Sequence, residues 1–222
     1  MKLKKLTSAV ALTCAVALSQ AALAETGRIT ANLASVDVMH DGRPVTISRT
    51  SDKDATLPDA YSKIGRNCPP FCVQPMTIAA GIETVGELEV LGYLKRIGNG
   101  DRQVMVVDSR TPDWVARGTI PGSVNIPWNK INVDMAGAFD VEAGADTQEG
   151  ILTNQFGAVL RDGQWDFRNA KTLVLFCNGI WCPQSLVNIK TLANMGYPAY
   201  KLKWYRGGMQ SWLSVGLSTI TP

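Results

Sequence analysis

The sequence predicts an α/β fold in which helices cover both faces of a parallel sheet. Residues 104–107 and 173–176 are short, wholly apolar runs, as expected for buried parallel strands. Helix signals flank both runs, and a further strand near 199–202 and a last helix around 209–215 complete the alternation. Strands that alternate with helices in this way form parallel sheets, and no internal repeat is visible.

The helix signals are capping residues, prolines and apolar stripes. Residues 84–87 have the form of a capping box at a helix start. Pro112 and Pro183 are each placed to open a helix, and Gly196 is placed to end the second of these. The stripes expected to face the sheet are Val85, Leu88, Leu91 and Leu94 in one helix and Leu186, Ile189 and Leu192 in another.

The first 24 residues have the features of a cleaved signal peptide. Three lysines stand among the first five residues, and residues 6–18 form an apolar run that is short for a membrane span. Ala22-Leu23-Ala24 is a cleavage site, so Glu25 becomes the first mature residue. We expect a periplasmic or otherwise exported protein; an uncleaved anchor is the alternative.

The charge of the mature chain is balanced. The full sequence has 22 Lys and Arg against 19 Asp and Glu, and the three signal lysines account for its net charge of +3. A near-neutral mature protein lacks the excess of positive charge that is typical of proteins that bind nucleic acid or an anionic membrane surface. We therefore expect no nucleic-acid partner, and no later segment is apolar enough to predict a membrane span in the mature chain.

The mature chain divides into an N-terminal extension, residues 25–80, and a domain, residues 81–218. Within the extension, residues 35–39 and 45–48 flank an Asp-Gly turn signal at 41–42, which predicts a β-hairpin. The remainder of the extension is rich in proline and is expected to be irregular. Inside the domain, the acidic stretch 134–149 is expected to be a solvated surface insertion, with a lid or docking loop as the alternative.

The residue with the clearest chemical potential is Cys177. It follows a predicted buried strand and precedes a predicted helix, and ligands bind at the carboxyl ends of strands in open α/β sheets. The positive end of the helix lowers the pKa of a thiol placed there and favours the nucleophilic thiolate. Gly179 would let the backbone curve so that several N–H groups face one point. A buried core cysteine is the alternative, and the Asn-Gly after Cys177 argues against it.

Three motifs resemble the signatures of the rhodanese-like domain family. Residues 107–110 (Val-Asp-Ser-Arg), followed by residues 114–127 with their Gly-Thr-Ile-Pro-Gly-Ser core, resemble its first signature. Residues 173–177 (Leu-Val-Leu-Phe-Cys) resemble its active-site strand. Residues 205–212 (Tyr-Arg-Gly-Gly-Met-Gln-Ser-Trp) resemble its carboxyl-terminal signature. The three motifs occur in the family's order and span the predicted domain.

The resemblance implies a catalytic cysteine that carries sulfur as a persulfide, and this role falls on Cys177. The implied partners are a small sulfur-containing donor and a thiol or other nucleophilic acceptor, and no cofactor or metal is expected. Asp108 and Arg110 match the family's Asp-x-Arg pair, which we interpret as structural. Arg206 is a candidate for substrate binding, with a surface ion pair as the alternative. The backbone amides expected to hold the anionic persulfide or the donor belong to Asn178, Gly179, Ile180, Trp181 and Cys182.

The sequence departs from the family's pattern in ways that bear on substrate. Thr119 stands where the family usually carries histidine, and residues 178–182 include no arginine or lysine. Thiosulfate is a dianion that benefits from a fixed positive charge, so we expect it to be a poor donor. The related phosphatases need an arginine six positions after the cysteine. Pro183 occupies that position, which excludes phosphatase activity.

A second cysteine, Cys182, closes the same loop. Two thiols at the ends of one short loop suggest that Cys177 attacks and Cys182 resolves, with chance placement of Cys182 as the alternative. A disulfide needs Cα atoms closer than about 7 Å, which a curved loop can meet. In an oxidising compartment such a bridge would be the resting state, and a thiol–disulfide reductant protein would be needed to open it.

Cys68 and Cys72 form a second pair around Pro69-Pro70-Phe71. An extended proline spacer would hold the two sulfurs apart, so pairing within the motif requires a turn. A structural disulfide, a redox relay to the Cys177 loop, and a four-cysteine zinc site all remain open. Four mature cysteines allow three complete pairings, and the sequence alone does not choose among them.

Three classes of function remain open. The first is a sulfurtransferase of the cell envelope that uses a persulfide on Cys177. The second is a thiol–disulfide redox protein that uses Cys177 and Cys182. The third is a catalytically idle rhodanese-like module used for binding.

Overall fold

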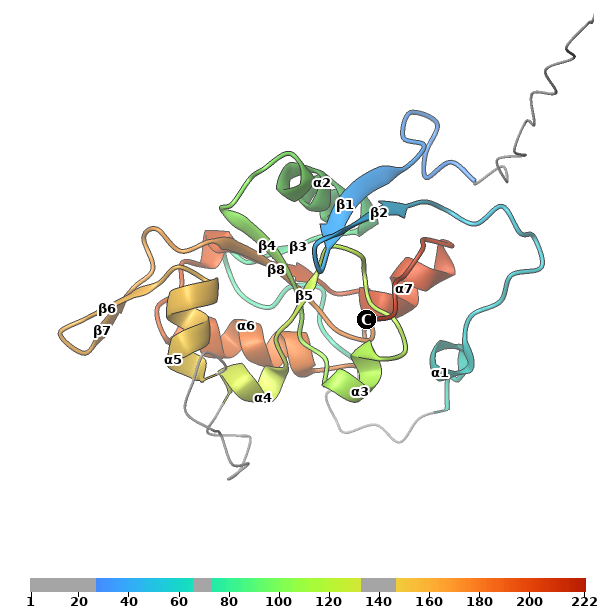
Figure 1. The fold of residues 1–222 in the computed structure, drawn as a ribbon. Helices are drawn as coiled ribbons and strands as arrows, with labels where there is room; N and C mark the ends of the chain where they lie inside the picture. The colour runs from blue at the N-terminus through green and yellow to red at the C-terminus, as the bar shows by residue number, and fades with distance from the viewer. Residues whose placement is uncertain (1–26, 66–72, 133–146) are drawn as a thin grey trace, which may run out of the picture.

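The computed structural model describes residues 27–65, 73–132 and 147–222 (Figure 1). Its centre is a five-stranded parallel sheet in the order β3-β9-β8-β4-β5. The strands are β3 (Glu83–Thr84), β4 (Val104–Asp108), β5 (Val124–Asn125), β8 (Thr172–Phe176) and β9 (Leu202–Tyr205). The predicted α/β class, with helices on both faces of a parallel sheet, is confirmed.

The two faces of the sheet bury two separate apolar cores, because successive side chains of a strand point to opposite faces. On β8, Leu173 and Leu175 enter one core while Val174 and Phe176 enter the other. Both sides of the central strand are therefore sealed from water, which explains its wholly apolar sequence.

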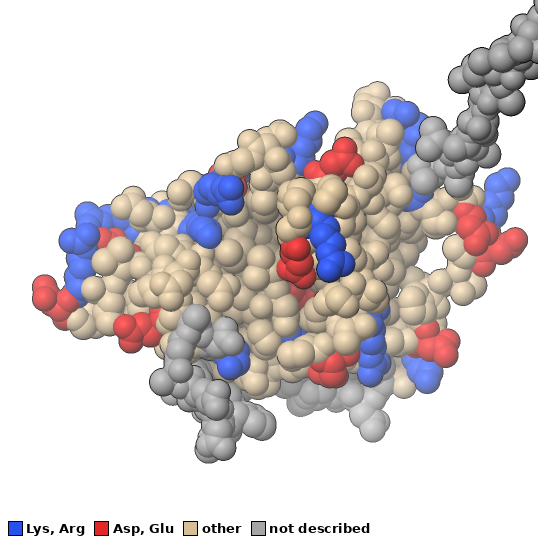
Figure 2. Space-filling view, in the orientation of Figure 1, with Lys and Arg blue, Asp and Glu red and all other residues tan. Residues whose placement is uncertain are grey.

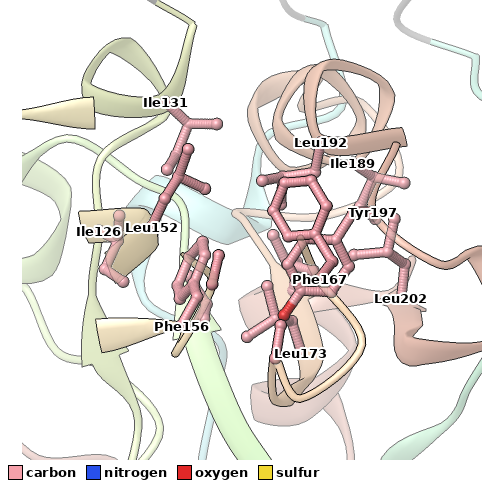
Figure 3. Close-up of a cluster of buried hydrophobic side chains, with 14 of the residues drawn as sticks. Ile126, Ile131, Leu152, Phe156, Phe167, Leu173, Ile189, Leu192, Tyr197 and Leu202 are labelled. Carbon is pink, nitrogen blue, oxygen red and sulfur yellow. The ribbon is translucent and has the colours of Figure 1, made fainter. Parts of the chain in front are cut away.

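The first core lies under the helices of the carboxyl half. Ile189 and Leu192 are fully buried there with Phe156, Phe167 and other apolar side chains (Figure 3). The elements on this side are α4 (Trp128–Ile131), α5 (Gln148–Gly150) with its continuation η1 (Ile151–Gln155), and α6 (Gln184–Asn194). A small antiparallel ribbon, β6 (Val159–Arg161) with β7 (Gln164–Asp166), leads back to β8.

The second core lies under α2 (Glu87–Gly98), α7 (Gly208–Ser214) and the N-terminal hairpin (Figure 1). The hairpin consists of β1 (Val36–His40) and β2 (Arg43–Ile47), as predicted. Asp41 and Gly42 both have positive φ at its turn, the conformation for which Asp-Gly is suited. The short helices α1 (Asp59–Ser62), α3 (Pro112–Val115) and the turn η2 (Ala199–Lys201) complete the described elements.

Two of the predicted element boundaries are wrong. The first long helix begins at Glu87, and its cap is Gly86, whose backbone N–H donates to the Glu89 carboxylate over 2.9 Å. The predicted box at 84–87 instead overlaps β3. In the observed helix Leu88 is 54% exposed, and the buried face consists of Val90, Leu91 and Leu94.

The second boundary concerns the last strand. It runs from Leu202 to Tyr205, because its parallel pairing with β8 starts at Leu202 opposite Leu173. The residues expected to begin the strand, 199–201, form the turn η2. The predicted helices at Pro112 and Pro183 and the last helix are confirmed.

Several predicted features lie outside the described residues. These are the signal peptide, the motif with Cys68 and Cys72, and the acidic stretch up to residue 146. In the described parts of the chain, no helix has the length and apolarity needed to cross a membrane. On the face shown in Figure 2, acidic and basic side chains are interspersed.

Candidate active site: the Cys177 loop

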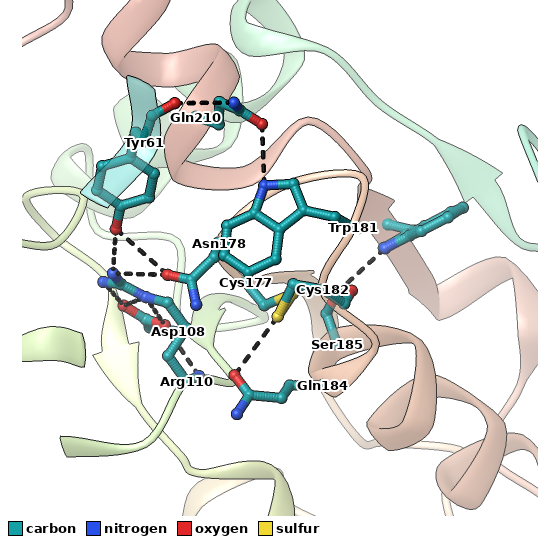
Figure 4. Close-up of a disulfide and its surroundings, with 11 residues drawn as sticks. Tyr61, Asp108, Arg110, Cys177, Asn178, Trp181, Cys182, Gln184, Ser185 and Gln210 are labelled. Atoms are coloured by element: carbon teal, nitrogen blue, oxygen red, sulfur yellow. Dashed lines mark hydrogen bonds and ion pairs between the residues drawn. A yellow bond between two sulfur atoms is a disulfide. The ribbon is translucent and has the colours of Figure 1, made fainter. Parts of the chain in front are cut away.

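Cys177 stands at the point where β8 ends and the chain turns toward α6. Its side chain is 2% exposed and that of Cys182 is 4% exposed. The two sulfurs form a disulfide across the loop, with Cα atoms 6.3 Å apart (Figure 4). The predicted juxtaposition of Cys177 and Cys182 is confirmed, and the loop is in its oxidised state.

The N-terminal end of α7 packs directly against the loop. The backbone N–H of Met209 donates to the carbonyl of Cys177 over 3.0 Å, and that of Gln210 donates to the carbonyl of Asn178 over 2.9 Å. This approach requires glycine at 208, because a Cβ there would lie only 2.2 Å from the Cys177 carbonyl oxygen. Gly208, the second of the paired glycines in the carboxyl-terminal motif, therefore allows α7 to pack closely on the reactive loop.

One backbone amide of the loop donates a hydrogen bond within the loop itself. The N–H of Cys182 donates to the carbonyl of Gly179 over 2.9 Å. In the bridged loop this amide is therefore used within the loop, and the expectation that the amides from 178 to 182 hold the persulfide stays a prediction. Ile180, at the tip, is 41% exposed. Substrate binding by the remaining loop residues stays a prediction.

Asp108 and Arg110 form a buried ion pair beside the loop. Both side chains are fully buried, and the Nε of Arg110 donates to Asp108 Oδ1 over 2.8 Å. Thr119, which occupies the position of the family's histidine, donates its hydroxyl to Asp108 Oδ2 over 2.6 Å. Burial opposes the charge of Arg110, but the hydrogen bonds and attraction from Asp108 outweigh it and raise the pKa of the guanidinium. These contacts support the structural interpretation of the pair.

The guanidinium of Arg110 also reaches the reactive loop. Its Nη1 lies 3.4 Å from Oδ1 of Asn178 and 3.0 Å from the hydroxyl of Tyr61 (Figure 4). Arg110 thus joins the buried ion pair to the residue that follows Cys177, and Asp108 compensates its charge. The sequence of the loop alone did not indicate this contact.

An aromatic layer flanks the loop. The rings of Tyr61 and Trp114 have centroids 6.0 Å apart, and those of Trp114 and Trp181 are 6.1 Å apart. Arg117 lies over Trp114, 4.7 Å from its ring centroid. The layer draws on α1 of the extension, α3 of the domain and the loop itself, so the extension is part of the site's surroundings.

Among the residues that the structure describes, Arg206 has no carboxylate partner, so the surface ion pair that was the alternative to substrate binding is not seen there. Its guanidinium donates to the carbonyls of Gln74, over 2.7 Å, and Pro75, over 3.0 Å. These contacts fasten the end of the N-terminal extension to the turn before α7. A substrate-binding role for Arg206 stays a prediction. In this structure its guanidinium is bound to two backbone carbonyls.

Metal binding finds no support in the described parts of the chain, which hold no group of three or more His, Cys, Asp or Glu able to bind an ion. Two of the four cysteines of the zinc alternative are joined to each other. The other two, Cys68 and Cys72, lie outside the described residues.

Comparison with known proteins assigns the family. The model of the rhodanese-like domain matches residues 91–215, which is more than half of the chain. The protein therefore belongs to the rhodanese-like domain family, as its three motifs predicted. No curated protein sequence matches the chain.

Solved structures similar to the chain are distant in sequence. The human single-domain sulfurtransferase is 21% identical, over 59% of this chain and 95% of that chain, with a TM-score of 0.37. The polysulfide-sulfur transferase homodimer of Wolinella succinogenes is 18% identical, over 64% and 81%, with a TM-score of 0.37. A protein of unknown function from Rhodopseudomonas palustris, described as a possible tyrosine phosphatase, is 21% identical, over 64% and 86%, with a TM-score of 0.41.

Proposed function

We propose that the protein is an exported sulfurtransferase that carries sulfane sulfur as a persulfide on Cys177. The observation that carries this proposal is the place of Cys177. It directly follows the central strand of a rhodanese-like domain and begins the loop that leads to an eleven-residue helix, α6. The positive end of that helix favours a thiolate at this point.

The reaction begins with reduction of the loop. A dithiol exchanges with the Cys177–Cys182 disulfide, so that two protein thiols form and the dithiol becomes a disulfide. The Cys177 thiolate then attacks the outer sulfur of a donor. A new S–S bond forms on Cys177, the donor's S–S bond breaks, and the rest of the donor leaves as a thiolate or other anion.

The acceptor completes the cycle. Its thiolate attacks the outer sulfur of the persulfide, and Cys177 leaves as a thiolate. We propose a donor with a neutral or singly charged sulfane sulfur, such as an organic persulfide or organic polysulfide, because the loop from 178 to 182 offers no cationic side chain to a dianion.

The test is sulfur transfer from an organic polysulfide to an acceptor thiol by the reduced protein. Cys177→Ser should abolish transfer and leave the fold intact, because serine is nearly isosteric with cysteine. Ser211→Ala, on α7, is the matched control and should retain transfer. Retention of most activity in Cys177→Ser would contradict the assignment of the nucleophile.

A second function is favoured by the bridge itself. Two cysteines already joined across one loop could exchange electrons with a partner dithiol without carrying sulfur. In that case the reduced protein would reduce a disulfide substrate but would form no persulfide with a sulfur donor. An idle binding module would do neither, and its bridge would persist in the presence of a dithiol.

A further inference from the structure

Two residues outside the reactive loop tie it to the rest of the molecule. Tyr61 belongs to α1 of the N-terminal extension, and Gln210 belongs to α7 near the carboxyl terminus. Neither lies in the loop between Cys177 and Cys182, yet each makes hydrogen bonds with a residue of that loop (Figure 4).

Tyr61 fixes the side chain that follows Cys177. Its hydroxyl accepts a hydrogen bond from Arg110 Nη1 over 3.0 Å and donates to Asn178 Oδ1 over 3.2 Å. Burial raises the pKa of the Tyr61 hydroxyl, so the group keeps its proton and remains a donor at neutral pH. All three side chains are buried, so water does not replace the hydroxyl freely.

Gln210 fixes the loop from the other side. Its Oε1 accepts from the indole Nε1 of Trp181 over 3.0 Å, and its Nε2 donates to the Tyr61 carbonyl over 3.0 Å. Its backbone N–H donates to the Asn178 carbonyl. One residue therefore connects the extension, the loop and α7.

We propose that Tyr61 and Gln210 are positioning residues that hold the Cys177 loop in its bridged conformation and so set how readily a dithiol opens the bridge. The inference rests on the proposed function and deepens it by naming what regulates the same loop. Reduction breaks one S–S bond and separates two sulfurs that were bonded, so the loop between residues 177 and 182 has to rearrange. The hydrogen bonds that Tyr61 and Gln210 make with the bridged loop oppose this rearrangement.

The test measures the equilibrium between the bridge and dithiothreitol. Wild type, Tyr61→Phe and Gln210→Met are equilibrated with set ratios of reduced and oxidised dithiothreitol and then quenched with an alkylating reagent. Mass analysis of the peptides containing Cys177 and Cys182 reads this bridge alone, so the other cysteines do not contribute. Each variant removes side-chain hydrogen bonds but keeps nearly the same volume.

The expected result is a bridge that opens more readily in both variants. Loss of the buried hydrogen bonds of Tyr61 or the part-buried hydrogen bonds of Gln210 raises the equilibrium constant for reduction roughly fivefold to tenfold; a tenfold change corresponds to about 30 mV. Tyr200→Phe and Gln164→Met alter exposed residues outside the site and should stay at the wild-type value. A melting curve of each bridged variant establishes that it is folded, and if Gln210→Met is not, Tyr61→Phe alone decides.

The inference is overturned if the folded variants stay within twofold of wild type, if their bridges become harder to reduce, or if the control variants shift equally. Its failure is distinguishable from failure of the proposed function. Persulfide formation on reduced wild-type Cys177 is measured separately: an unchanged equilibrium with persulfide present defeats only the inference. A shifted equilibrium without persulfide defeats only the sulfurtransferase proposal.

Discussion

Nη1 of Arg110 lies 3.4 Å from Oδ1 of Asn178, which joins a fully buried ion pair to the residue beside the reactive cysteine. The pair is therefore placed to act on both the stability of the domain and the shape of the loop. A buried charge that loses its partner is costly, whereas an exposed pair contributes little.

Arg110→Met should lower the free energy of unfolding by about 3–5 kcal/mol, because it leaves the Asp108 carboxylate buried and uncompensated. The control is Arg96→Met, which removes an exposed partner of Asp101 and should cost about 1 kcal/mol or less. Urea unfolding of the bridged proteins measures both. The double variant Asp108→Asn/Arg110→Met should recover part of the loss, and equal losses in Arg110→Met and Arg96→Met would contradict the argument.

Helix α2 has a buried leucine and an exposed leucine whose truncations can be compared. Leu91→Ala should lower the free energy of unfolding by about 2–5 kcal/mol, because Leu91 is buried in the core under the helix. Leu88→Ala removes the same atoms from an exposed position and should change it by only about 0.5 kcal/mol. Equal losses of stability in the two variants, measured by urea unfolding, would contradict the assignment of Leu91 to the buried face and Leu88 to the exposed face of α2.

Thiosulfate should be a poor donor with a high KM, compared with an organic polysulfide. The loop has no cation, Arg110 is paired with Asp108, and Arg206 is bound to backbone carbonyls. Ile180→Arg, at the exposed tip of the loop, should lower the thiosulfate KM by adding the missing charge. Ile180→Met is the control. Steady-state kinetics with both donors test this, and a micromolar KM for wild type would show that charge reaches the substrate from elsewhere.

Cys182 should gate Cys177. Wild type, isolated with the loop bridged, should be inactive until a dithiol is added, whereas Cys182→Ser should transfer sulfur without prior reduction. The unprotected Cys177 of Cys182→Ser should also be oxidised more readily to sulfinic acid by peroxide. Assays of both proteins with and without dithiol test this. Equal activity in all four conditions would remove the gate.

Local patterns in the sequence predicted much of the fold. The strands β4 and β8, the hairpin and the helix α6 each follow from periodicity, apolar runs or turn residues within a few positions. The start of α2 was missed because glycine can cap a helix as well as the threonine of the expected box can. Leu88 was wrongly placed in the core because a spacing of every third residue drifts from the 3.6-residue turn of the helix.

The candidate site was predicted only in part, because some of its contacts join distant segments. The pair Cys177 and Cys182 lies within one loop and could be inferred from spacing. Tyr61 contacts Asn178 across 117 positions and Gln210 across 149, and no local pattern marks such contacts. The one sequence signal for Tyr61 was a buried-type aromatic residue in an otherwise irregular, proline-rich extension.

The proposal that Cys177 carries sulfur is tested most directly by mass mapping of the loop peptide in three states. As isolated, the peptide should contain Cys177 joined to Cys182; after treatment with a dithiol and its removal, it should contain two thiols. After addition of an organic polysulfide and prompt alkylation, Cys177 should have gained the mass of one sulfur atom and Cys182 none. Extra sulfur on Cys182 alone, or on neither cysteine, would contradict the account.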